Sequence, residues 1–223
     1  MTEKRSTIEK IPKKSPFREY AEAFAIAIIL ALFIRTFIVQ AFKIPSGSMK
    51  PTLLIGDHLL VNKFVYGLKI PFTDQFILDF SQPKRGDIIV FKYPNDEKID
   101  FIKRVIGVSG DKIEIKEDQL FINDEKIDKE YTDIFKDPGA IKSEVYREFL
   151  GERTHDILLD PSPPENHGPF IVPEGSLFVM GDNRKHSHDS RYWKYVALNK
   201  VKGKALIIYW SWPNWKRFLN IIR

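Results

Sequence analysis

The sequence predicts a mostly β protein, in which a single N-terminal transmembrane helix precedes an antiparallel β domain with an inserted smaller subdomain. Three observations predict this class. The 223-residue chain begins with a basic segment that leads into a long apolar run. After residue 42, short β-branched and aromatic segments alternate with turns. The regular alternation of strands and helices that a parallel sheet needs is missing. The expected divisions are a basic tail over 1–20, an anchor over 21–42 and a folded domain over 43–223, with an insertion over about 126–173.

Composition and charge exclude several classes of protein. The chain has no cysteine, which excludes a disulfide scaffold, a cysteine nucleophile, a zinc ribbon and an iron–sulfur site. The net charge is +5, and residues 1–18 carry +4 of it through six basic and two acidic side chains. The folded part is therefore nearly neutral, and we expect no nucleic acid as a partner because such binding needs a basic face.

The apolar run predicts the anchor. Twelve consecutive apolar residues fill 23–34, and with the stretch after Arg35 the run extends over 23–42. Twenty helical residues span about 30 Å, the thickness of the hydrocarbon core of a bilayer. Arg35 lies near the distal end, where its long side chain can reach the headgroups. The basic residues before the run predict a cytoplasmic N-terminus, with the domain on the other side of the membrane.

Two other interpretations of this run stay open. A basic start, an apolar run and Val39-Gln40-Ala41 are also typical of a cleavable secretory signal. Arg35 and the bulky Phe37-Ile38 argue against cleavage at that place. A helix buried in the core of the domain is the other possibility.

Strands are expected wherever short runs of β-branched and aromatic residues end at turn residues. An example is the run after Lys84-Arg85-Gly86, which is almost entirely apolar. Residues 113–115 and 120–122 read as a hairpin across Glu117-Asp118. The polar, proline-containing stretch 126–173 is the insertion. The expected strands are 57–65, 87–93, 99–108, 113–115, 120–122, 177–180 and 204–210.

Two segments carry polar residues in settings that suggest catalysis. Ser46 and Ser48 flank Gly47 between two prolines, directly after the anchor. Proline fixes φ, and glycine permits close backbone approach, which suits a serine that faces a substrate. A serine nucleophile needs a base, and Lys103 shares its strand face with Phe101 and Val105, whose apolar side chains favour a neutral amine. A plain juxtamembrane linker and an exposed strand lysine fit the same residues, so the residues alone leave this open.

Histidine offers no metal site in this sequence. His186 and His188 are two residues apart, so their side chains diverge on a strand or a helix. The motifs Gly-x-Ser-x-Gly and His-Glu-x-x-His are absent. We expect no metal and no cofactor.

Four segments together resemble the type I signal peptidases, which are membrane-bound serine proteases that remove signal peptides. They occur in the family's order, after an N-terminal anchor, and the resemblance covers about residues 20–210. The segment Lys185-His186 departs from the family, which more often has an acidic residue followed by asparagine, and we expect this difference to affect the local surface. The four segments are Pro45–Thr52, Arg85–Phe91, Ile102–Asp111 and Gly181–Arg191.

The resemblance implies roles for individual residues. Ser48 is the nucleophile, and a neutral Lys103 is its general base. The backbone N–H of Ser48 and the hydroxyl of Ser46 form the oxyanion hole. Ser187 orients the Lys103 amine. Asp189 and Arg191 form a supporting ion pair, and Asp182 and Arg184 belong to the scaffold nearby.

The resemblance also implies the substrates and the location. The substrates are preproteins with signal peptides, which bind as an added β-strand and are cut after a small-x-small site. The protein is a single-pass protein of the inner (plasma) membrane with an extracytoplasmic catalytic domain, so the lipid bilayer is a partner. The tryptophans at 210, 212 and 215 belong either to the membrane interface or to the core. The pockets for small side chains are lined by Phe42, Ile44, Leu53 and Ile102.

Three other functions stay open at this stage. A self-cleaving repressor-type protease shares the Ser/Lys chemistry, but that family has no membrane span. A membrane-anchored binding protein could carry the same fold with an inactive site. A soluble β protein could be released by cleavage after Ala41.

Overall fold

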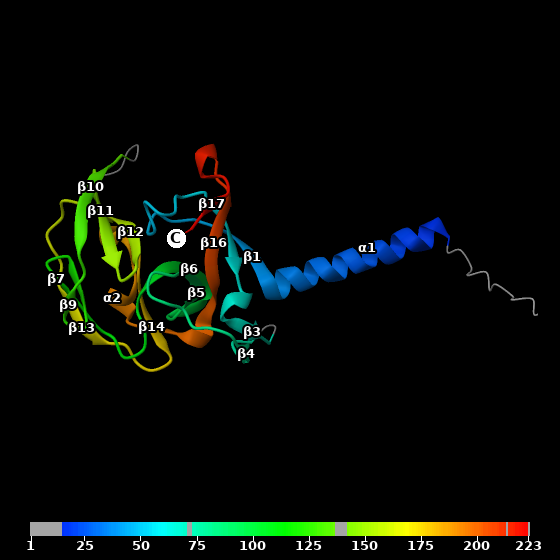
Figure 1. Cartoon of the computed structure of the whole chain (residues 1–223), viewed down its shortest axis with the longest axis horizontal. Helices are drawn as coiled ribbons and strands as arrows, with labels where there is room; N and C mark the ends of the chain where they lie inside the picture. The colour runs from blue at the N-terminus through cyan, green and yellow to red at the C-terminus, as the bar shows by residue number, and fades with distance from the viewer. Residues whose placement is uncertain (1–14, 71–72, 137–141, 213, 223) are drawn as a thin grey trace, which may run out of the picture.

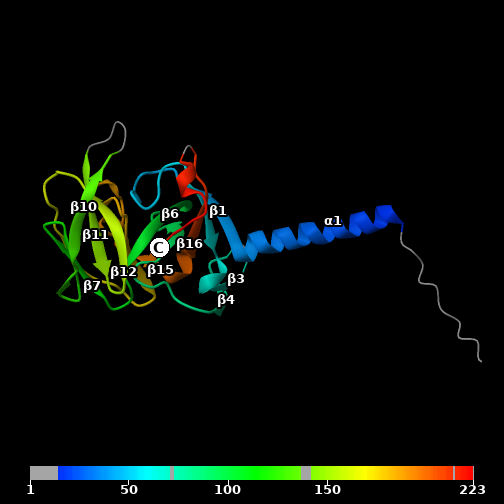
Figure 2. The same ribbon diagram turned by 45° about the horizontal axis from the view of Figure 1, so that its top comes forward.

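The computed structural model describes residues 15–70, 73–136, 142–212 and 214–222. A long helix projects from a body made of β-sheets, as both views show (Figures 1 and 2). Most of the expected basic tail over 1–20 lies outside the described residues. The strands pair antiparallel throughout the sheets, which confirms the predicted fold class.

Helix α1 (Pro16–Phe33) begins where the sequence provides a cap. The Ser15 side chain accepts a hydrogen bond from the backbone N–H of Arg18, and proline occupies the first helical position. A π-helical turn, η1 (Ile34–Ile38), continues α1, so the helical segment has 23 residues. At 1.5 Å per residue it is about 34 Å long. None of its residues is buried, and it is long and apolar enough to cross a membrane. A core helix is thereby excluded.

The helix ends four residues earlier than the sequence predicted. Val39–Lys43 forms strand β1, which pairs antiparallel with β2 (His58–Asn62). The apolar pattern could not reveal this boundary, because Phe37, Ile38 and Val39 suit a membrane helix and a strand equally well. Ala41 and Phe42 therefore belong to the edge of the β domain.

The main sheet has the strand order β1-β2-β16-β5-β6-β14-β15, and β17 pairs with β16. Strands distant in sequence are neighbours in it: β16, near the C-terminus, lies between β2 and β5 (Figure 1). The remaining bounds are Ile88–Tyr93 for β5, Asp96–Gly107 for β6, Ser176–Met180 for β14, Val196–Ala197 for β15, Val201–Trp210 for β16 and Asn220–Ile221 for β17.

Two further sheets form the part of the body farthest from α1 (Figures 1 and 2). One has the order β13-β7-β8-β9 and the other β10-β11-β12, while β3 and β4 form a separate hairpin. Most of the strands in these two sheets belong to the expected insertion over 126–173, and the hairpin of β7 and β8, which precedes it, also lies outside the main sheet. The bounds are Gly67–Lys69 (β3), Phe76–Asp79 (β4), Lys112–Lys116 (β7), Gln119–Ile122 (β8), Glu125–Lys126 (β9), Lys129–Phe135 (β10), Ser143–Leu150 (β11), Arg153–Leu159 (β12) and His167–Ile171 (β13).

Short helical turns connect some of these strands. They include the single-turn helix α2, which follows the loop after β14. Their bounds are Phe64–Tyr66 (η2), Arg184–His186 (η3), Ser190–Trp193 (α2), Leu198–Lys200 (η4) and Trp215–Arg217 (η5).

Strand β6 is buried on both faces at its C-terminal end. Val105 packs with Ile89 and Phe91 in one apolar cluster, and Ile106 packs with Phe178 and Met180 in another. Successive side chains of a strand point to opposite faces, so Lys103 shares the face of Val105 and Arg104 the face of Ile106. The strand therefore carries a lysine and an arginine into two different buried environments.

Candidate active site

The segment that carries Ser48 is fixed by apolar anchors on both sides of the serine. Ile44, Met49 and Leu53 are all buried in one apolar cluster under the segment. Within the segment, the backbone N–H of Lys50 donates to Gly47, and that of Leu53 donates to Met49. Ser48 is left 9% exposed at the edge of this anchored turn.

The structure brings Lys103 to Ser48 across 55 residues of sequence. The Lys103 Nζ lies 2.5 Å from the Ser48 Oγ, and Lys103 is 4% exposed. Burial lowers the pKa of Lys103 to about 8, although the carboxylates of Asp189 and Asp182 oppose this change. The Phe101 ring lies 5.5 Å from the amine on the same strand face. A large fraction of the amine is therefore neutral near pH 8.

Ser46 lies close to the Ser48 hydroxyl. The two Oγ atoms are 3.5 Å apart, although Ser46 itself is exposed. A hydroxyl at this distance can donate to an oxygen atom of a group bound at Ser48.

The expected ion pair between Asp189 and Arg191 is present. The Arg191 guanidinium donates to both carboxylate oxygens of Asp189, over 2.8 and 2.9 Å, and both side chains are buried. Burial raises the pKa of Asp189, but Arg191 more than offsets this and holds the pKa below its usual value. Asp189 also accepts the backbone N–H of Gly181. Ser187 is buried beside this pair and helps to lower the pKa of Asp189, but among the described residues no hydrogen bond joins its Oγ to Lys103.

Asp182 forms an ion pair that the sequence did not predict, with Arg104. The Arg104 Nε and Nη2 donate to the two Asp182 oxygens over 2.8 and 2.7 Å, and both side chains are 1% exposed. Thr52, four residues after Ser48, donates to the same carboxylate over 2.5 Å. This pair joins the nucleophile segment, β6 and the loop after β14. No local pattern indicates this pairing, because Asp182 lies 78 residues after Arg104 in the chain.

Lys185 also differs from expectation. The sequence predicted a surface effect at this position, but the Lys185 side chain is 3% exposed. Its Nζ donates to Asp118, in the turn between β7 and β8, over 2.7 Å and to the Pro163 carbonyl over 2.9 Å. Lys185 therefore connects the loop after β14 to the sheet that contains β7 and β8.

Two residues after β14, Asn183 and Gly181, lie against the backbone of the segment that carries Ser48. The Asn183 backbone N–H donates to the Ser48 carbonyl, and its Nδ2 donates to the Gly47 carbonyl, both over 3.1 Å. Gly181 lies so close that a Cβ there would overlap the Ser48 carbonyl oxygen and the Ser187 hydroxyl. Only glycine fits this contact without movement of the neighbouring backbone.

We expect Gly181→Ala to lower kcat about 100-fold, since a displacement of about 1 Å at a reacting group has an effect of this size. Cleavage of a peptide substrate by the purified full chain measures it. Gly151→Ala is the control, because an added Cβ there meets no atom within 4 Å, although its φ of 65° strains the turn. Equal losses in the two variants would contradict the prediction.

The residues expected to line substrate pockets come together in part. Ile44 and Leu53 are buried in the apolar cluster under Ser48, and Ile102 packs against that cluster. Phe42 lies on β1 and is half-buried. The described atoms thus place an apolar floor beneath the Ser48 segment.

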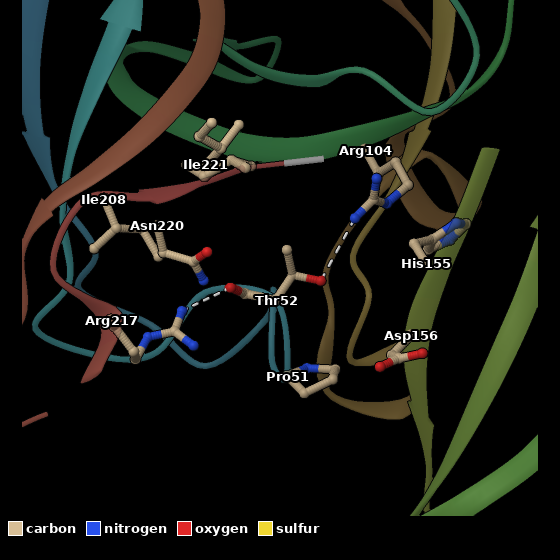
Figure 3. A pocket seen from close by; sticks show the side chains of 10 residues that line it. Pro51, Thr52, Arg104, His155, Asp156, Ile208, Arg217, Asn220 and Ile221 are labelled. Carbon is tan, nitrogen blue, oxygen red and sulfur yellow. Dashed lines mark hydrogen bonds between the residues drawn. The ribbon is translucent and has the colours of Figure 1, made fainter.

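A separate cavity of about 270 Å³ lies beside the nucleophile segment (Figure 3). Pro51 and Thr52 line it together with Arg104 and His155, and Arg217 donates to the Thr52 carbonyl at its opposite side. Neither Ser48 nor Lys103 is among its lining residues. In the described part of the chain, no group of three or more His, Cys, Asp or Glu side chains is arranged to hold a metal ion.

A buried serine hydroxyl in contact with a lysine amine of lowered pKa is an arrangement typical of serine peptidases in which lysine replaces histidine. Comparison with known proteins agrees with this class. Residues 17–210 match the family described as signal peptidase, peptidase S26. The chain belongs to this family and is a serine peptidase.

Individual relatives support the same assignment. The chain is 40% identical to signal peptidase I of Pseudomonas fluorescens over 92% of this chain and 77% of that protein. It is 38% identical to signal peptidase I of Pseudomonas aeruginosa over 94% and 78%. For signal peptidase I of Aquifex aeolicus, the identity is 36% over 87% and 84%. Because the match extends over most of each chain, the relation includes the helix and the β domain together.

Proposed function

We propose that this protein cleaves signal peptides from exported preproteins after a small-x-small site, with Ser48 as nucleophile and Lys103 as general base. The observation that carries the proposal is the 2.5 Å contact between the Lys103 amine and the Ser48 hydroxyl in a buried setting. A neutral amine at this distance can take the hydroxyl proton as the oxygen atom attacks. The membership of the chain in the signal peptidase family supports the choice of substrate.

The reaction proceeds in two halves. Ser48 Oγ bonds to the scissile carbonyl carbon while its proton passes to Lys103 Nζ, and the carbonyl oxygen becomes negative between the Ser48 N–H and the Ser46 hydroxyl. The C–N bond then breaks, and Lys103 gives its proton to the departing amine of the mature protein. Water loses a proton to Lys103 and attacks the acyl group. The signal peptide leaves with a carboxylate, and Ser48 recovers its proton.

The substrate binds as a β-strand at a free strand edge. Strand β14 pairs with β6 only from Arg104 onward, so among the described strands the preceding residues of β6 are paired on the β5 side alone. That free edge leads directly to Lys103, and β1 offers a second edge beside Phe42. Main-chain hydrogen bonds at such an edge hold an extended peptide, and the apolar floor selects small side chains.

The helical segment Pro16–Ile38 anchors the domain in the inner (plasma) membrane, with the N-terminus in the cytoplasm. Its apolar side chains are exposed, which is costly in water and favourable in lipid. Trp212 and Trp215 are 62% and 52% exposed and pack edge-to-face, which favours a role at the membrane interface over one in the core. An anchored enzyme meets the apolar signal segment of its substrate in the same bilayer, at a raised effective concentration.

The proposed specificity has a direct test. The detergent-solubilised full chain is expected to cut a preprotein with an Ala-x-Ala site after its last alanine. Changing the alanine at position −1 to leucine should reduce kcat/KM at least about 100-fold, because the added side chain has no room in the pocket. The cut is located by sequencing the new N-terminus. Cleavage at sites without small residues would favour another Ser/Lys protease, and no cleavage would favour a binding protein with an inactive site.

The rate should follow the protonation state of Lys103. The base acts only when neutral, and burial lowers the pKa of Lys103 to about 8. We therefore expect kcat/KM to rise with pH up to about 8 and to fall about tenfold for each pH unit below that value. Initial rates between pH 5 and 9 measure this dependence, and tryptophan fluorescence checks that the protein stays folded. A constant rate from pH 9 to pH 6 would exclude Lys103 as the base.

A further inference from the structure

The sheet formed by β10, β11 and β12 carries a carboxylate into the interior of the protein. Glu148 of β11 is 1% exposed, and His155 lies opposite it on β12. A buried carboxylate must be compensated. The His155 Nε2 lies 3.3 Å from Glu148, but burial lowers the pKa of His155 and so disfavours a charged imidazole. The compensating cation comes from outside the sheet.

That cation is Arg184, which lies in the loop after β14. Its Nη1 and Nη2 donate to the two Glu148 oxygens over 2.8 and 2.5 Å, and Arg184 itself is buried. The backbone carbonyl of Arg184 accepts a hydrogen bond of 2.5 Å from Arg191, the partner of Asp189. Glu148 therefore binds the side chain of Arg184, and the main-chain carbonyl of Arg184 accepts the hydrogen bond from Arg191. A two-pronged Arg–carboxylate contact fixes orientation as well as distance.

A second contact links the same sheet to the preceding residues of the loop. The Leu158 backbone N–H of β12 donates to the Asp182 carbonyl over 2.8 Å, and Leu158 forms a parallel bridge with Asn183. Asn183 in turn donates to the carbonyls of Ser48 and Gly47. Asn183 thus connects the β10–β12 sheet to the backbone of Gly47 and Ser48.

We infer that the β10–β12 sheet is a positioning element for the Ser48–Lys103 pair and that Glu148 is its key positioning residue. Glu148 acts through Arg184 on the loop that carries Asn183, Ser187 and Asp189. The inference rests on the proposed function, in which Ser48 and Lys103 perform the reaction.

This arrangement predicts an effect on kcat rather than on KM. Glu148 accepts hydrogen bonds from Arg184 and lies opposite His155 on the neighbouring strand. The strand edges proposed to bind the substrate belong to β1 and β6, so Glu148 does not belong to them. Loss of its charge leaves the Arg184 cation without its partner and releases the loop that holds Ser48 in place. The chemical step should suffer while peptide binding stays close to normal.

The first experiment compares Glu148→Gln with Arg147→Gln in the full chain, using an Ala-x-Ala preprotein. Arg147 is the neighbouring residue on the other face of β11, where it pairs with Asp156 over 3.0 Å and is half exposed. We expect Glu148→Gln to lower kcat at least tenfold with KM within twofold of the wild type. Arg147→Gln should leave both constants within twofold.

Two further measurements separate positioning from simple folding. The acidic limb of the pH–kcat profile should move to lower pH in Glu148→Gln, because an unpaired Arg184 cation and a displaced Asp189 carboxylate both disfavour the charged Lys103 amine. The double variant Glu148→Met with Arg184→Met replaces both charges with apolar side chains. It should recover thermal stability without recovering kcat, since the oriented contact is still missing.

The outcomes are distinct. A kcat of Glu148→Gln within twofold of the wild type overturns the inference and leaves the proposed function intact. The same holds if the double variant regains wild-type kcat, because burial compensation alone would then suffice. A wild-type chain that does not cut the preprotein overturns the proposed function and this inference together.

Discussion

Removal of either member of the Ser48–Lys103 pair should abolish cleavage of an Ala-x-Ala preprotein. Ser48→Ala removes the attacking oxygen, and Lys103→Met keeps an unbranched side chain in the buried site without an amine. In serine peptidases, loss of one such group lowers kcat by roughly four to six orders of magnitude. Initial rates at high enzyme concentration measure the residual activity of each variant.

Two comparisons make this prediction specific. Lys103→Arg should be as inactive as Lys103→Met, because a guanidinium stays protonated and cannot accept the Ser48 proton. Lys116→Met, at an exposed lysine of β7, should cleave at the wild-type rate. If Lys103→Met retained activity while Ser48→Ala did not, the base would be another residue, and His186 and His188 would be examined next.

Asp182→Asn should cause a large loss of stability. The substitution keeps the shape of the side chain but removes the charge of the carboxylate that accepts two hydrogen bonds from the buried Arg104 guanidinium. Breaking a buried ion pair in this way costs about 3–5 kcal/mol in the free energy of unfolding. For a protein of this size, the melting temperature should fall by roughly 6–20 °C. Thermal unfolding in detergent, followed by circular dichroism, measures the change.

The matched control for this prediction is Asp156→Asn. Asp156 also pairs with an arginine, Arg147, but both side chains are partly exposed, so the pair contributes only about 0–1 kcal/mol. Cleavage activity should fall in Asp182→Asn as well, because Thr52, four residues after Ser48, donates to the same carboxylate. A melting temperature within about 2 °C of the wild type would show that water or a neighbouring group compensates Arg104.

Much of the fold could be predicted from local sequence patterns. The strand over 87–93 was recognisable because almost every residue is apolar, and the structure places Ile88–Tyr93 between β16 and β6. The hairpin of β7 and β8 followed from its alternation across Glu117-Asp118. Strands β10 and β11 were not predicted, because their outward positions carry charges and Glu148 breaks the apolar pattern of the inward face.

The site could be predicted as far as residue types and neighbours on one strand allow. The face shared by Phe101, Lys103 and Val105 follows from the period of two in a strand, and the structure confirms the buried lysine. Two buried pairs could not be predicted from this sequence alone: Arg104 with Asp182, and Arg184 with Glu148. Each pair joins elements at least 36 residues apart, and no local pattern specifies which charges meet.

The sequence by itself determined the apolar N-terminal helix, the β class, the serine-containing turn and the strand face that Lys103 shares with Phe101 and Val105, since these depend on composition and on short-range periodicity. Tertiary structure alone decided that the helical segment ends before Val39, because strand β1 forms there only through its pairing with β2. It also decided the 2.5 Å contact of Lys103 with Ser48 and the compensation of each buried charge around it. Desolvation and long-range pairing exist only once the sheets have packed together.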